Sequence, residues 1–222
     1  MFFYRPTDGD LPKPGSVSPE PKTCFIATAL GNPPKQIAKI RKELTSILKP
    51  DGFKCIDAGS RVTGRNILEK IWGMIMSVPV GVAIFTEDVA PGTMANIFYE
   101  IGLMQQLGKE TLIIKTPQAK VPSDFVQTEY IEFDENNKSE FKDRIQLYID
   151  YLNKQALFYQ TMVSQLSDSN PILAVDYYRR AYLLNGDKKI NKQVTEIIQD
   201  LGKPLREAIV DNSPFMHITN NR

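Results

Sequence analysis

Short apolar runs alternate with longer segments of helical period through the middle of the chain. The runs CFIATAL, FKCIDA, VGVAIF, TLIIK and EYIEF are separated by segments whose apolar residues recur every three or four positions. Apolar runs of this length are typical of buried strands, and the longer recurrence is typical of amphipathic helices. The alternation predicts an α/β fold built from βαβ units around a mainly parallel sheet.

Three helices are expected to connect the first four strands. The first covers residues 33–48 and ends before Pro50, and the second covers residues 66–78. The third follows the polar loop TEDVAPG and closes at Gly108 and Lys109. Because crossovers between parallel strands are right-handed, the simplest topology is a flavodoxin-like strand order, 2-1-3-4-5. Ligands are then expected to bind beyond the carboxyl ends of the strands.

The two ends of the chain differ from this middle part. Residues 1–22 contain several prolines and glycines and no apolar period, so they are expected to form a flexible leader. After Phe133 the pattern is helical almost to the end, and residues 174–186 (AVDYYRRAYLLNG) resemble the second helix of a tetratricopeptide unit. The predicted organisation is therefore a leader, an α/β domain at 23–135 and an α-helical extension at 136–222. A solitary repeat cannot bury both of its faces, so the extension is expected to pack on the α/β domain, on a second copy or on a partner protein.

The composition of the chain argues against several classes of function. The net charge is +1 with acidic and basic residues interspersed, so no basic face is available to bind duplex nucleic acid. No apolar stretch approaches the roughly 20 residues of a membrane span, and the start of the chain does not have the pattern of a signal peptide. The predicted location is cytoplasmic. The chain has one histidine and two cysteines, and we interpret Cys24 and Cys55 as small buried hydrophobes. No metal or other cofactor is expected, and chemistry would come from carboxylates, hydroxyls and backbone dipoles.

Glu100 is the candidate catalytic residue. It is the only charged residue between Asp88 and Lys109, in a segment that is otherwise almost entirely apolar. Burial would raise the pKa of such a carboxyl, and perturbed carboxylates in clefts are enriched at active sites. The alternative is a glutamate at the exposed edge of a buried helix. Asn96, one turn earlier on the same face, would bind the carboxylate or a ribose hydroxyl, or would simply cap the loop.

Further candidates lie near the carboxyl ends of the predicted strands. Phosphate contacts are expected from Arg61 and Arg65 and from the backbone amides at the start of the second helix, although a solvated loop explains these arginines equally well. The loop after the first strand would line the site through its backbone groups. The candidate substrate-binding residues are Asn96, Ala29, Gly31, Arg61, Arg65, Thr86 and Tyr99.

The segment AIFTEDVAPGTMANIFYEIGLMQQLGK closely resembles one found in the nucleoside 2-deoxyribosyltransferase-like and Toll/interleukin-1-receptor-like nucleotide-binding families. There an Asn, aromatic or apolar residues, Glu, an aliphatic residue and Gly are followed by a Leu-Gly-Lys turn. The opening CFIATALGNPP is similar to the first strand and substrate loop of these families. GSRVTGRNILEKIWGMI is similar to the segment that leads to the helix before the third strand. The resemblance covers residues 23–116, and the Glu100 motif is its specific part.

The resemblance implies both the architecture and the bond that is attacked. It implies a Toll-like or deoxyribosyltransferase-like α/β domain in which Glu100 is the catalytic carboxylate. Enzymes of these families cleave or exchange the bond between an anomeric ribose carbon and a base, and NAD is among the substrates of the Toll-like branch. We therefore expect a nucleotide N-glycosidase that hydrolyses the ribose–base bond of NAD or a related nucleotide.

Two other functions remain open at this point. Deoxyribosyltransferases carry a further Asp shortly before the catalytic Glu, whereas this chain has APGTM at residues 90–94. Base exchange by a nucleoside deoxyribosyltransferase is therefore less favoured than hydrolysis, although Glu87 and Asp88 are nearby acids. The other alternative is a non-catalytic module that senses a nucleotide and signals through its helical tail. Toll-like relatives often complete their sites between subunits, so activity only in an assembly is a further possibility.

Overall fold

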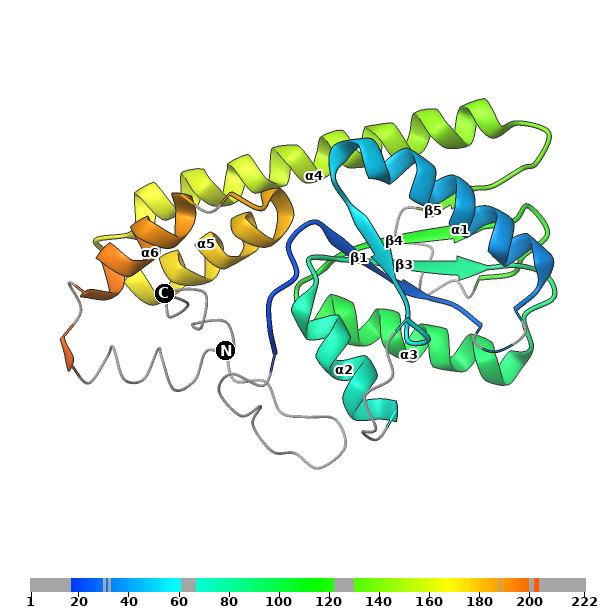
Figure 1. Ribbon diagram of the computed structural model, residues 1–222, viewed down its shortest axis with the longest axis horizontal. Helices are drawn as coiled ribbons and strands as arrows, with labels where there is room; N and C mark the ends of the chain where they lie inside the picture. Colours follow the sequence, from blue (N-terminus) through cyan, green and yellow to red (C-terminus); the bar gives the residue numbers. More distant parts are fainter. Residues whose placement is uncertain are drawn as a thin grey trace. The chain divides into compact units, whose positions relative to one another are not determined.

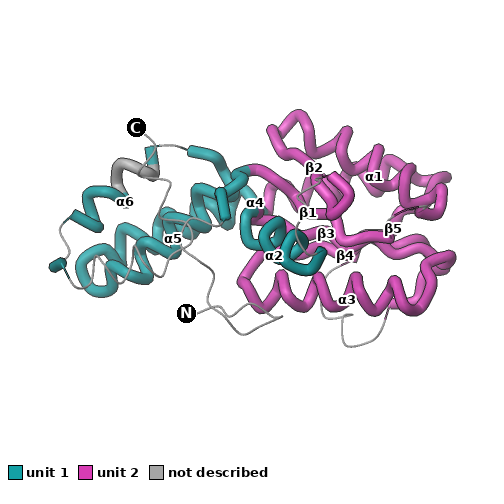
Figure 2. The backbone as a smooth tube through the Cα atoms, turned by 60° about the horizontal axis from the view of Figure 1, so that its bottom comes forward, with its two compact units in different colours: residues 1–21, 65–77, 152–222 teal, residues 22–64, 78–151 magenta. Residues whose placement is uncertain are grey.

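The structure is a computed structural model of the full chain. It describes residues 17–29, 31, 33–60, 67–121, 130–187, 189–199 and 202–203. The chain divides into two compact units, one of residues 1–21, 65–77 and 152–222 and the other of residues 22–64 and 78–151 (Figure 2). Within the described residues, no helix combines the length and the apolar character that a bilayer crossing requires.

The second unit is built around a five-stranded parallel sheet (Figure 1). Its strands run in the order β2-β1-β3-β4-β5, and each neighbouring pair is parallel. The predicted α/β class and strand order are thereby confirmed. The strand bounds are β1 Thr23–Ala27, β2 Lys54–Ile56, β3 Val80–Phe85, β4 Glu110–Lys115 and β5 Tyr130–Glu132.

Helices α1 and α3 cover opposite faces of this sheet (Figure 1). Helix α1, Lys35–Leu48, buries Ile37, Ile40, Leu44 and Leu48 on one stripe, as its spacing predicts. It passes into a short 3-10 helix, Lys49–Asp51, and the chain turns at Gly52, whose φ of 81° favours glycine. Helix α3, Pro91–Gln106, starts with a proline in its first turn and is followed by Gly108 with a φ of 64°.

Strand β3 is the centre of the second unit. All six of its residues are buried, which explains the unbroken apolar run VGVAIF. Alternate residues face opposite helices: Phe85 stacks on Phe98 of α3, with ring centroids 4.8 Å apart. On the same face Gly81 lies so close to Met104 that a Cβ added to this glycine would stand 1.8 Å from the sulfur. The backbone of β3 therefore approaches α3 more closely than any side chain at position 81 allows.

The first unit contains the remaining helices. Helix α2 is Ile67–Ser77, α5 is Pro171–Asn185 and α6 is Lys189–Gln199, while α4, Lys138–Leu166, belongs to both units. The side chain of Asn170 caps α5 by accepting from the Leu173 amide. Val175 of α5 packs with Ile198 of α6 in a small apolar cluster. The tetratricopeptide-like segment predicted at 174–186 lies in α5, whose end is marked by Gly186 with a φ of 72°.

The contact of Gly81 with Met104 gives a stability prediction. Gly81→Ala is expected to lower the free energy of unfolding by about 1–3 kcal/mol, because Met104 has to leave its buried position. Gly102→Ala is the control: a Cβ there meets no atom of the described residues, and alanine favours a helix interior by about 0.5–1 kcal/mol. Urea denaturation of both variants measures the two effects. Equal midpoints for Gly81→Ala and the wild type would contradict the close packing.

Candidate functional site

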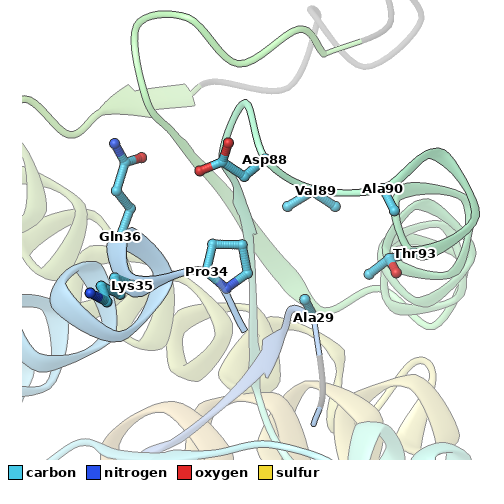
Figure 3. Close-up of a pocket in the computed structure, with 8 residues that line it drawn as sticks. All are labelled: Ala29, Pro34, Lys35, Gln36, Asp88, Val89, Ala90 and Thr93. Carbon is cyan, nitrogen blue, oxygen red and sulfur yellow. The ribbon is translucent and has the colours of Figure 1, made fainter. Parts of the chain in front are cut away.

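A cleft opens at the carboxyl ends of β1 and β3 (Figure 3). Its volume is about 480 Å³, which is in the range of sites for small molecules and nucleotides. One wall comes from the start of α1 and the other from the loop after β3 and the first turn of α3. The lining residues are Ala29, Pro34, Lys35, Gln36, Asp88, Val89, Ala90 and Thr93.

The strand order explains why the cleft lies there. From β1 the chain crosses through α1 to β2 on one side, whereas from β3 it crosses through α3 to β4 on the other. The two connections leave in opposite directions, so a crevice remains between the helix starts. The backbone amides of both first turns lie near this crevice, and such amides attract anions. This position beyond the strand ends is where the sequence predicts ligands to bind.

Three threonines directly follow the three central strands. Thr28 follows β1, Thr86 follows β3 and Thr116 follows β4, and all three side chains are buried. The hydroxyls of Thr28 and Thr86 have no hydrogen-bond partner among the described residues. Buried hydroxyls without partners cost free energy, so they are suited to binding polar groups at this edge of the sheet. The hydroxyl of Thr116, in contrast, donates to Glu87 over 2.6 Å.

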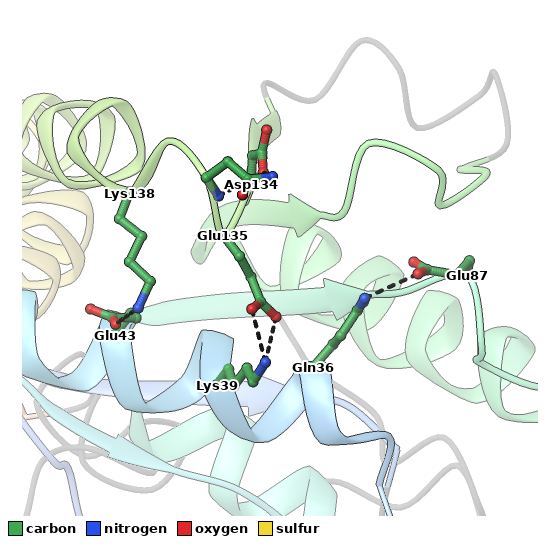
Figure 4. Close-up of polar contacts among 8 residues, drawn as sticks. Gln36, Lys39, Glu43, Glu87, Asp134, Glu135 and Lys138 are labelled. Atoms are coloured by element: carbon green, nitrogen blue, oxygen red, sulfur yellow. Dashed lines mark hydrogen bonds and ion pairs between the residues drawn. The ribbon is translucent and has the colours of Figure 1, made fainter.

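Glu87 fastens the loop after β3 to its surroundings, and Figure 4 shows the hydrogen bond that it accepts from Gln36. One carboxylate oxygen accepts from the Thr116 hydroxyl, and the other accepts from the Gln36 amide of α1 over 3.1 Å. The bond from Thr116, followed by a backbone bond at Glu87 itself, lowers the pKa of Glu87. These contacts give the ionised Glu87 a structural role beside the cleft.

Two exposed ion pairs connect α1 to the segment that precedes and opens α4 (Figure 4). Lys39 binds Glu135 over 2.7 Å and Lys138 binds Glu43 over 2.5 Å. Exposed pairs of this kind contribute about 0–1 kcal/mol each. They orient α1, which carries Lys35 and Gln36, without adding much stability.

Glu100 lies in the third turn of α3 and is half-buried. Burial raises the pKa of its carboxyl from 4.5 to about 7. Within the described residues no hydrogen bond or ion pair reaches this carboxylate. It is not one of the residues lining the cleft. Glu100 is seven residues after Thr93, which puts both on one face of α3 about 10 Å apart along the helix axis. A ligand that extends from the cleft along α3 would therefore approach Glu100.

The other predicted site residues fall into three groups. Ala29 lines the cleft and Thr86 is buried at its edge. Gly31, Asn96 and Tyr99 are exposed, and among the described residues Asn96 makes no hydrogen bond to Glu100. The predicted phosphate ligands Arg61 and Arg65 lie outside the described residues.

Sequence reasoning missed part of the cleft. Lys35, Gln36 and Thr93 line it but were not predicted, and Asp88 was considered either as a substitute for the missing second acid or as an ordinary loop charge. Their common feature is that they lie on a helix start or loop after β1 or β3. The predicted strand order places the starts of the helices after β1 and β3 at the ligand crevice. Considering both helix starts would therefore have identified these residues. In the described part of the chain no group of three or more His, Cys, Asp or Glu side chains is arranged to hold a metal ion.

Neither the models of known protein families nor the curated protein sequences yield a match to this chain. The family resemblance of residues 23–116 therefore stays a prediction.

The raised pKa of Glu100 predicts that this residue destabilises the fold at neutral and alkaline pH. The charged form of Glu100 is disfavoured in the folded chain. The resulting loss in the free energy of unfolding is therefore absent below the ordinary pKa of 4.5, grows as the pH rises to about 7 and is constant above that. Glu100→Gln is expected to be more stable than the wild type at about pH 8, by on the order of 1–3 kcal/mol, and equally stable at about pH 4.

Urea denaturation across this pH range provides the measurement. The control is Glu140→Gln, which removes an exposed carboxylate in the first turn of α4. Its effect on the free energy of unfolding should stay small, because the contacts of Glu140 with Asn137 and Arg144 are exposed. A pH-independent difference between Glu100→Gln and the wild type would contradict the burial of a titrating carboxyl.

Proposed function

We propose that the protein is a nucleotide N-glycosidase that hydrolyses the ribose–base bond of NAD or a related nucleotide through Glu100. The observation that carries the proposal is the half-buried Glu100 carboxyl, whose pKa is raised and which no described residue neutralises. Such a group raises the energy of the fold, so a functional reason for it is expected. It lies on the helix whose first turn lines the cleft at the sheet edge.

One carboxylate is enough for this reaction. In the transition state the bond from the anomeric carbon to the base nitrogen lengthens, and its electron pair moves to the base. Positive charge then develops on the ribose, and an adjacent ionised carboxylate stabilises it. Water adds to the anomeric carbon and releases a proton. The nicotinamide ring is cationic in NAD and becomes neutral when it leaves. The leaving group therefore needs no added proton.

The cleft residues fit the rest of a nucleotide. Lys35 and the amides of the first turns of α1 and α3 are suited to phosphate oxygens. Asp88 is suited to accept hydrogen bonds from ribose hydroxyls. The Thr28 and Thr86 hydroxyls lie at the same edge. We infer that the phosphates occupy the cleft and that the ribose bearing the scissile bond extends along α3 towards Glu100.

The separation between Glu100 and the cleft favours a second candidate, a nucleotide-sensing module without turnover. Thr93 and Glu100 are about two helical turns apart, so a ligand confined to the cleft would not touch the carboxylate. Residues 90–94 also contain no second acid. In this case the nucleotide binds at the strand ends, and the helices after β5 pass the signal to a partner or to a second copy.

Incubation of the full chain with NAD, other nucleotides and deoxynucleosides tests the leading proposal. Chromatography measures the released base. We expect release from NAD or a related nucleotide, and a loss of about 100-fold or more in Glu100→Gln. Glu140→Gln is expected to keep the wild-type rate. Because the ionised carboxylate is required, kcat/KM should rise as the pH passes through about 7.

Three outcomes separate the alternatives. Equal release by wild type and Glu100→Gln would remove Glu100 from the mechanism. A rise in thermal midpoint with a nucleotide but no released base would support the sensing module, because only the native state binds the ligand. Transfer of deoxyribose to an added base would indicate a nucleoside deoxyribosyltransferase.

A further inference from the structure

The two cysteines of the chain are direct neighbours across strands β1 and β2. Cys24 and Cys55 are partners in the parallel register of these strands. Directly opposite residues of a sheet point their side chains to the same face. That face is the one covered by α1, because Arg41 and Thr45 of α1 act on Cys55. Cys24 is fully buried, whereas Cys55, on the edge strand, is half-buried.

The spacing of the strands permits a bond between the two sulfurs. Neighbouring strands lie about 4.7–4.9 Å apart. Disulfides join Cα atoms that are about 4.4–6.8 Å apart, most often near the middle of that range. The pair is thus inside the allowed range but near its short end.

The surroundings of the two thiols make them chemically unequal. The Cys24 thiol donates a hydrogen bond to the Cys55 sulfur, and this bond lowers the pKa of Cys55 to about 7 against the opposing effect of burial. The Thr45 hydroxyl and the Arg41 cation lower it further. The same hydrogen bond, together with burial, raises the pKa of Cys24. Arg41 is held near this site by an ion pair with the buried Asp57.

We propose that Cys24 and Cys55 form a reversible thiol–disulfide switch that hydroperoxides oxidise. Cys55 is the attacking residue, because it lies on the edge strand, is only half-buried and has the more acidic thiol of the two. Cys24 is the resolving residue. It needs no access to solvent, because Cys55 lies directly beside it on the neighbouring strand β2. This inference is independent of the proposed N-glycosidase function, since neither thiol lines the cleft.

The reaction balances with one hydroperoxide. The Cys55 thiolate attacks the peroxide, a sulfur–oxygen bond forms, and the oxygen–oxygen bond breaks. The leaving hydroxide or alkoxide takes up the proton that the Cys55 thiol had released and departs as water or an alcohol. The Cys24 sulfur then attacks the sulfenic acid, a sulfur–sulfur bond forms, and hydroxide leaves and takes up the Cys24 proton as water. The two thiols lose two electrons in total, and the peroxide gains them.

The experiment treats the full-length protein with hydrogen peroxide and follows intact mass and free thiols. We expect a monomer that has lost the mass of two hydrogen atoms and both free thiols, and that regains them with dithiothreitol. Peptide mapping should find the bond between Cys24 and Cys55. Retention of both free thiols under peroxide, or a bond only between two chains, would overturn the proposal.

Two variants and one measurement on the wild type test the separate roles. Cys24→Ser should accumulate a sulfenic acid at Cys55 that dimedone traps, whereas Cys55→Ser should give no trapped product at Cys24. Brief alkylation of the untreated wild type with iodoacetamide should modify Cys55 before Cys24. This last measurement does not depend on whether a variant folds, and equal modification of both thiols would exclude the assigned order.

Discussion

The burial of strand β3 between two helices is the constraint on which the rest of the second unit depends. One of its faces receives α1 and the other receives α3, and the missing side chain of Gly81 lets Met104 of α3 press against the strand. With both faces covered, the strand can leave the core only at its ends. Its carboxyl end therefore delivers Thr86, Glu87 and Asp88 to one place, beside the loop that leaves β1. The cleft is a consequence of this arrangement.

Much of the fold follows from local patterns in the sequence. Parallel strands are buried on both faces, so runs such as VGVAIF have no polar interruption and are recognisable by themselves. The end of α1 is marked by Pro50 and Gly52, and the end of α3 by Gly108. Glu100 is also recognisable from a local pattern, because it is the one charged residue in a mostly apolar helical segment. Its half-buried position and raised pKa agree with that reasoning.

The features that escaped prediction depend on contacts between distant segments. The bonds from Glu87 to Thr116 and Gln36 join three elements, and no local pattern distinguishes them from ordinary loop charges. Cys24 is buried, as its interpretation as a small hydrophobe requires, whereas Cys55 is only half-buried. The pairing of the two cysteines depends on the register of β1 and β2. Register is set by packing across the whole sheet rather than by the residues of one strand. The arginines at 61 and 65 lie outside the described residues.

The anchoring of Glu87 makes the two parts of the wall opposite α1 mechanically unequal. Through this carboxylate, the loop after β3 is joined both to α1 and to the end of β4. Among the residues that the structure describes, the first turn of α3 has no such side-chain tie, because its N-cap is Ala90, whose side chain cannot accept a hydrogen bond. Adjustment to the size of a ligand would therefore fall on the first turn of α3, while the loop after β3 keeps its place beside α1 and acts as a fixed reference surface.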